Sequence, residues 1–172
     1  MRRSRGSKGR GAFSLVEVAL ATVIVGIGIV AVIASLQAGS RVNGAGRDLT
    51  QAVFLAQEIR EWTVRLPFRD PDPGDANNPP GPDGISPQTF VDDLDDLYDP
   101  AGLVYCPPRD GLGLPISGMT GWSQVLMLSW RDPNGLTATV SPGASTIINV
   151  KVSVRFRGKE VLATSWLVAK RS

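Results

Sequence analysis

The sequence predicts an α+β fold, in which a long N-terminal helix packs on a C-terminal antiparallel β-sheet. An apolar run from Phe13 to Leu36 has the composition and length of a membrane-spanning helix. Residues 42–63 continue with apolar side chains at helical spacing. Residues 122–168 instead alternate apolar and polar side chains with a period of two, and turn sequences interrupt them. The 172 residues are enough for one membrane-anchored domain with a modest core.

The positive charge of the chain is concentrated ahead of the apolar run. Beyond residue 12 the chain has 13 basic and 16 acidic residues, so we expect no nucleic-acid partner. The run would be about 36 Å long as a helix, which exceeds the core of a secretory signal. Basic residues on the N-terminal side predict a cytoplasmic N-terminus and an outer C-terminal domain. These residues are Arg2, Arg3, Arg5, Lys8 and Arg10.

Glu17 is an acid inside this apolar run. A carboxylate near the centre of a membrane helix costs about 2.5–3.5 kcal/mol on the insertion scale, and less near an end. One interpretation places Glu17 in the first turn, where the helix dipole favours an acid and the side chain reaches the headgroups. The other interpretation is that Glu17 keeps its charge for a partner amine.

The stretch "GAFSLVEV" resembles the processing site of type IV pilins and type II secretion pseudopilins. That family pattern is a basic leader, a small residue that is nearly always glycine, then Phe-Thr/Ser-Leu-x-Glu and an apolar helix. The resemblance implies cleavage between Ala12 and Phe13 and N-methylation of Phe13. Ala12 stands where the family has glycine, so a cut after Gly11 is the alternative. The resemblance also makes Glu17 an assembly residue that meets the Phe13 amine of a neighbouring subunit.

The resemblance therefore implies a structural subunit, either a minor pseudopilin or a minor type IV pilin. Such a subunit assembles through its N-terminal helix into a periplasmic or surface filament for protein secretion or pilus function. Its implied partners are a prepilin peptidase, other pilin or pseudopilin subunits, an inner-membrane assembly platform and membrane lipid. Its implied location is the bacterial inner membrane, as a single-pass protein with a periplasmic or extracellular C-terminal domain, before incorporation in the filament. The alternative is a single-pass membrane-anchored binding module that does not polymerise.

We divide the chain into a cleaved leader (1–12), a transmembrane or assembly helix (13–38), and an amphipathic continuation (39–66). The glycines between residues 39 and 46 predict a bend or break, after which Asp48 would cap a restarted helix. The helix should end by Leu66, because Pro67 follows. The apolar stripe that should pack on the sheet comprises Val42, Leu49, Val53 or Ala52, Ala56, Ile59 and Thr63.

Residues 67–121 are rich in proline, glycine and aspartate and predict a long irregular region. One short helix is expected at Gln88–Leu97. Aspartates in and beside this helix are weak candidates for Ca²⁺ ligands, since Ca²⁺ takes six to eight oxygens. A solvated acidic loop is the alternative, and no other cofactor is expected. The candidate ligands are Asp92, Asp93, Asp95, Asp96 and Asp99.

Residues 122–172 predict the antiparallel sheet. A first strand spans 122–130, a turn lies at 131–135, and "LTATV" forms a short strand. The segment 146–156 should bury alternate side chains from Ile148 to Phe156. A two-residue turn at Gly158–Lys159 would pair Phe156 with Val161 and Val154 with Ala163 before the last strand. The buried face of the first strand should comprise Trp122, Gln124, Leu126, Leu128 and Trp130.

We expect no enzymatic activity. The chain has no histidine, and it contains neither a glycine-rich phosphate loop nor a paired catalytic signature. Its one cysteine, Cys106, cannot form an intrachain disulfide and is expected to be a half-buried thiol.

Overall fold

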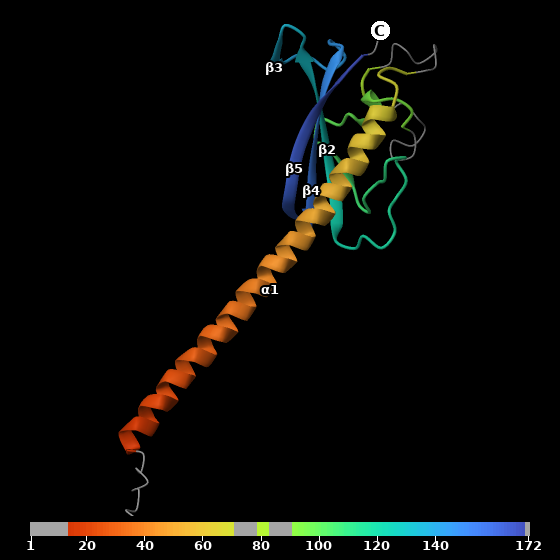
Figure 1. Cartoon of the computed structure of the whole chain (residues 1–172). Coiled ribbons are helices and arrows are strands. Elements are labelled where there is room, and N and C mark those ends of the chain that lie inside the picture. The colour runs from red at the N-terminus through yellow and green to blue at the C-terminus, as the bar shows by residue number, and fades with distance from the viewer. Residues whose placement is uncertain (1–13, 71–78, 83–90, 171–172) are drawn as a thin grey trace, which may run out of the picture. The chain divides into compact units, whose positions relative to one another are not determined.

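The computed structural model describes residues 14–70, 79–82 and 91–170. The predicted cleavage residues Gly11, Ala12 and Phe13 lie outside the described residues. One α-helix, α1, spans Leu15–Arg65, and an antiparallel five-stranded sheet follows it, which confirms the α+β fold (Figure 1). The chain divides into two compact units, Met1–Ala45 and Gly46–Ser172, and the second unit contains the sheet.

Helix α1 is continuous over 51 residues. The predicted break at residues 39–46 and the restart at Asp48 are therefore wrong. A glycine costs a helix only about 1 kcal/mol relative to alanine, which leaves the hydrogen-bond ladder intact when the flanking residues favour helix. The helix ends at Arg65, before Pro67, as predicted.

The sheet has the strand order β1-β2-β4-β5, and β3 pairs with the end of β2. All its pairings are antiparallel, and the strands at 122–132, 135–139, 147–156 and 159–169 lie where strands were predicted, although β2 and β3 extend into the turn predicted at 131–135. The first strand, β1, falls in the region predicted to be irregular, so that prediction was incomplete. The bounds are β1 Leu103–Tyr105, β2 Trp122–Asp132, β3 Gly135–Thr139, β4 Ile147–Phe156 and β5 Lys159–Ala169.

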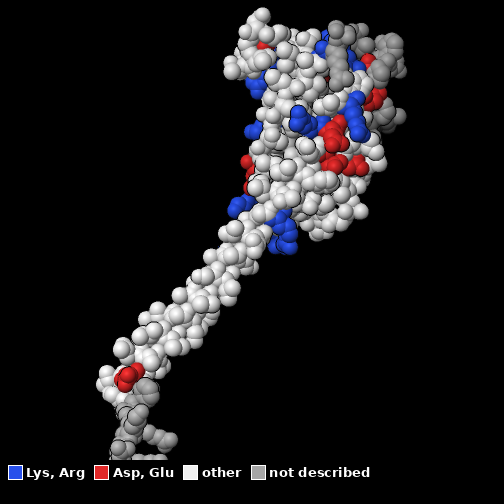
Figure 2. Space-filling view, viewed as in Figure 1, with Lys and Arg blue, Asp and Glu red and all other residues white. Residues whose placement is uncertain are grey.

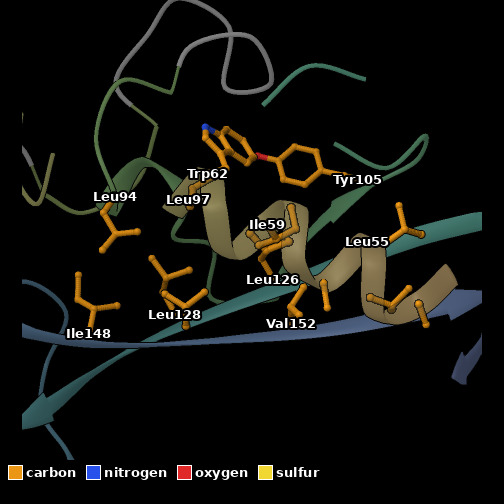
Figure 3. Packing of buried hydrophobic residues seen from close by; sticks show 14 of the residues in the cluster. Leu55, Ile59, Trp62, Leu94, Leu97, Tyr105, Leu126, Leu128, Ile148 and Val152 are labelled. Atoms are coloured by element: carbon orange, nitrogen blue, oxygen red, sulfur yellow. The ribbon is translucent and has the colours of Figure 1, made fainter. Parts of the chain in front are cut away.

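The core lies between one face of the sheet and the C-terminal part of α1 (Figure 3). All five side chains predicted for the buried face of β2 are buried, and Leu126 pairs with the buried Val152 of β4. On α1 the predicted stripe is correct for Ala52, Ala56, Ile59 and Thr63, which are buried. Val53 is 49% exposed, whereas Leu55 and Trp62, which the predicted stripe omits, are buried. The buried helix residues are Ala52, Leu55, Ala56, Ile59, Trp62 and Thr63.

The β4–β5 hairpin turns one residue earlier than predicted. Arg157 and Gly158 occupy the turn with φ of 51° and 80°, and Phe156 pairs with Lys159. Positive φ at both central residues is the geometry that suits the twist of a two-residue hairpin. A register shift between Val154 and Arg155 then pairs Val154 with Leu162, so both predicted pairings are wrong.

The helix predicted at Gln88–Leu97 is replaced, within the described residues, by a single 3₁₀ turn at Asp95–Leu97. Residues 88–90 lie outside the described residues. Leu94 and Leu97 are both fully buried against the core, and the Leu94 N–H donates to the carbonyl of Pro67 at 3.0 Å. The burial of these two leucines and the hydrogen bond to Pro67, just after α1, fix the position of the segment, so a longer helix is not needed.

Candidate functional site

The N-terminal half of α1 presents a long apolar surface. Thirteen large apolar side chains between Leu15 and Leu36 are each at least 49% exposed. The described residues include one helix long and apolar enough to cross a membrane, and its most apolar window has a mean hydropathy of 2.7. In Figure 2 this part of the helix is uncharged apart from one acidic patch near its N-terminal end. Exposure of so much apolar surface to water is unfavourable, whereas a lipid bilayer would cover it. The helix is therefore compatible with a single-pass membrane anchor.

Glu17 lies in the first turn of α1. Its N–H donates to the carbonyl of Ser14 at 2.9 Å, and the hydroxyl of Ser14 accepts from the N–H of Val16 at 3.3 Å. The side chain of Glu17 is exposed, and within the described residues its carboxylate has no hydrogen-bonding or ionic partner. From residue 14 to residue 40 it is also the one charged residue of the chain.

This arrangement allows one kind of chemistry. A single carboxylate on an apolar surface can accept hydrogen bonds from, and neutralise, a cation brought by another molecule. The N-terminal turn of the helix also favours a negative charge. The Phe13 amine, which the resemblance implies as that cation in a neighbouring subunit, lies outside the described residues.

The aspartate cluster serves local backbone structure. Asp93 Oδ1 accepts from the N–H groups of Asp95 at 2.8 Å and Asp96 at 3.1 Å. Asp96 Oδ2 accepts from the N–H groups of Asp92 at 2.9 Å and Asp93 at 3.2 Å. Asp99 Oδ1 accepts from the Ala101 N–H at 2.7 Å. The carboxylates of Asp93 and Asp96 therefore hold the 3₁₀ turn that buries Leu94 and Leu97.

Burial also changes the titration of this cluster. Burial raises the pKa of Asp93 to about 7, and the adjacent Asp95 carboxylate adds to the shift by repulsion. The pKa of Asp95 is raised as well, chiefly by burial. Asp93 is only 3% exposed. A proton is therefore held at the Asp93–Asp95 pair under conditions where a surface aspartate would be ionised.

Among the described residues, the candidate aspartates do not form an arrangement that would bind Ca²⁺. In the part of the chain that the structure describes, no three acidic or cysteine side chains converge as metal ligands would. Two of the candidate aspartates, Asp93 and Asp96, are each 3% exposed and direct carboxylate oxygens at backbone N–H groups. Calcium binding by Asp92, Asp93, Asp95, Asp96 and Asp99 stays a sequence-based hypothesis.

Cys106 is exposed, which corrects the expectation of a half-buried thiol. It follows the buried Tyr105, whose pKa burial raises to about 12. Arg109 lies over the Tyr105 ring, with its guanidinium carbon 5.1 Å from the ring centroid. These contacts belong to the packing of the loop that follows β1.

That loop is attached to α1 by contacts that the sequence pattern did not predict. Glu58 Oε2 accepts from the Gly111 N–H at 2.6 Å, and an Arg65 guanidinium N–H donates to the Gly111 carbonyl at 3.4 Å. Gln124 donates to the Leu55 carbonyl of α1 at 2.9 Å. Alternation places Gln124 on the buried face, but no sequence signal identifies the backbone groups that it bonds.

Comparison of the chain with protein-family models, curated proteins and solved structures finds no match.

Proposed function

We propose that the protein is a pilin-like structural subunit, a minor pseudopilin or minor type IV pilin. In this proposal a prepilin peptidase removes the leader, and the subunit then assembles through α1 into a filament for protein secretion or pilus function. The observation that carries the proposal is Glu17, a carboxylate in the first turn of a helix whose next 20 residues are uncharged, mostly apolar and exposed.

Three features support the proposal. The basic leader and "GAFSLVEV" resemble the prepilin processing site. Helix α1 runs without interruption from the apolar segment into residues that pack on the sheet, so the same helix supplies both the apolar segment and part of the core. The rest of the chain is an α+β unit in which this helix packs on an antiparallel sheet.

The physical basis of assembly is the cost of an unpaired charge. A Glu17 carboxylate buried among apolar helices is penalised unless a cation meets it with good geometry. The α-amine freed by cleavage at Phe13 has an ordinary pKa near 7.7–8.0 and is mostly protonated at neutral pH. Pairing of that amine with Glu17 of a neighbour would favour one register of the helices over others.

The second candidate function is a membrane-anchored binding module that does not polymerise. The observation that favours it is the folded outer unit, which needs no filament to explain its core or its anchor. In that case the leader would stay attached, and Glu17 would matter only for insertion into the membrane.

Replacement of Glu17 separates the two functions. We expect Glu17→Gln to abolish incorporation into filaments when the chain is co-expressed with a complete pilin-type assembly machinery, while Glu17→Asp retains part of it. Membrane insertion and the melting temperature of the outer unit should stay unchanged in both variants. Wild-type incorporation by Glu17→Gln would contradict the proposed role of the charge.

A further inference from the structure

Strand β5 is an open edge of the sheet. In the part of the chain that the structure describes, β5 pairs with β4 and has no strand on its other side. It is 11 residues long, and the nine residues from Val161 to Ala169 contain neither a charge nor a proline. A long uncharged edge strand offers a row of backbone N–H and C=O groups to any extended chain.

The opposite side of the sheet is protected. Strand β1 has three residues, and β3 joins β2 at a register shift between Arg131 and Asp132. Short strands and bulges are devices by which native sheets prevent pairing with other chains. Strand β5 is therefore the edge of the sheet that lacks such protection.

A groove runs beside this edge, between β5 and α1, with a volume of about 330 Å³. Its walls are fixed, because the indole N–H of Trp166 donates to the hydroxyl of Thr63 at 3.2 Å and so ties β5 to α1. A strand added to β5 would direct every second side chain towards this groove. The lining residues are Val53, Ala56, Gln57, Arg60, Leu162, Thr164, Ser165 and Trp166.

The chemistry of the groove selects its occupant. Its walls are apolar or neutral except for Arg60, which is exposed and has no ion-pair partner among the described residues. The one ion pair among the described residues lies outside the groove and joins Arg65 and Glu61, at 3.9 Å. An occupant with apolar side chains and one carboxylate near Arg60 would match both features.

We propose that β5 and this groove form a docking site for an extended segment of a different protein, which adds a strand to the sheet. A second copy of this chain fits less well. Its opposite edge is protected, and a second β5 strand carries no carboxylate between Val161 and Ala169 that could meet Arg60. The proposal goes beyond the filament function and does not depend on leader cleavage.

The test measures binding of a strand-forming peptide to the full chain in detergent micelles. The probe is a fluorescein-labelled nine-residue peptide that alternates threonine and valine, with glutamate in place of one valine. The critical variant is Thr164→Lys, on the groove face, and its matched control is Ala163→Lys, on the other face of the same strand. Both residues are exposed, so both variants should melt like the wild type.

We expect saturable binding, read as fluorescence anisotropy, that Thr164→Lys weakens by at least about tenfold and Ala163→Lys by less than about twofold. Arg60→Glu should reverse the preference between this peptide and one with lysine in place of glutamate. Absence of saturable binding, or equal effects of the two lysine variants, would overturn the proposal. Sedimentation that shows a dimer lost in Thr164→Lys would assign the groove to a second copy and overturn it as well.

Discussion

The side-chain amide of Gln124 donates to the main-chain carbonyl of Leu55 at 2.9 Å, which joins the central strand β2 to helix α1 through a fully buried polar group. The same amide donates to the carbonyl of Arg109 at 3.1 Å, and its oxygen accepts from the N–H of Arg109 at 2.7 Å. One side chain therefore connects the helix, the sheet and the loop after β1.

Loss of this amide should destabilise the folded unit that contains the sheet, Gly46–Ser172. Gln124→Met keeps the length of the side chain but leaves the partly buried main-chain groups of Arg109 without these bonds, and we expect a loss of about 2–4 kcal/mol in the free energy of unfolding. Denaturant unfolding followed by tryptophan fluorescence measures this loss. The matched control is Gln57→Met on the exposed surface of α1, which should change stability by less than about 0.5 kcal/mol. Equal stabilities of the two variants would show that the bridge is dispensable.

Gly113 is predicted to be intolerant of a side chain for two separable reasons. Its φ is +78°, and a Cβ atom there would lie 2.6 Å from the ring of Trp62. Gly118 has the same φ of +78°, with no atom within 4 Å of its Cβ position. Gly118→Ala should therefore cost only the backbone strain, about 1–2 kcal/mol, whereas Gly113→Ala should cost at least about 1 kcal/mol more.

Thermal melts of these two alanine variants test the contact of the loop with α1. A melting temperature for Gly113→Ala equal to that of Gly118→Ala would mean that the loop does not pack on Trp62 as described.

The stability of the unit Gly46–Ser172 should depend on pH through Asp93. Its folded pKa of about 7 lies above the unfolded value near 3.9, so folding retains a proton that the unfolded chain releases. This contribution is complete below about pH 4, declines as the pH rises towards 7, and is lost above 7. From these two pKa values the decline should be at most about 4 kcal/mol.

Asp93→Asn isolates this effect. Asparagine keeps an oxygen for the N–H groups of Asp95 and Asp96 but carries no titrating proton. Unfolding free energies measured from pH 4 to pH 8 should fall less steeply in the variant than in the wild type, with the variant more stable at pH 8. Parallel pH profiles for the two proteins would rule out Asp93 as the titrating group.

The strands and the buried faces were largely predictable, because a period of two in β2 and β4 is a direct consequence of burying one side of a sheet. The register of the last hairpin was not predictable from turn composition alone. Gly158 is compatible with a turn at 157–158 or at 158–159, and only the backbone shows Arg157 with positive φ. Strand β1 escaped prediction because its three residues lie among prolines, glycines and aspartates and form a strand by pairing with β2.

Of the candidate site, Glu17 was predictable from the sequence, whereas the roles of Asp93 and Asp96 were not. Glu17 stands out because carboxylates are rare in apolar runs, and its position in the first turn follows from where the helix begins. The break predicted at residues 39–46 does not occur, because the helix-breaking effect of single glycines is small compared with the cooperativity of a long helix. The roles of Asp93 and Asp96 depend on side chains that turn back to nearby N–H groups, and sequence composition does not distinguish that from metal binding.

Identification of the N-terminus of the membrane-extracted protein tests the proposed function most directly. The full chain would be expressed with and without a prepilin peptidase, and intact mass and N-terminal sequencing would be compared. With active peptidase we expect a mature chain that begins at Phe13 and carries one added methyl group. A start at Ala12 would keep the processing but move the cut to Gly11. A chain that still carries Arg2 to Arg10 beside active peptidase would contradict the pilin-like account and favour the anchored binding module.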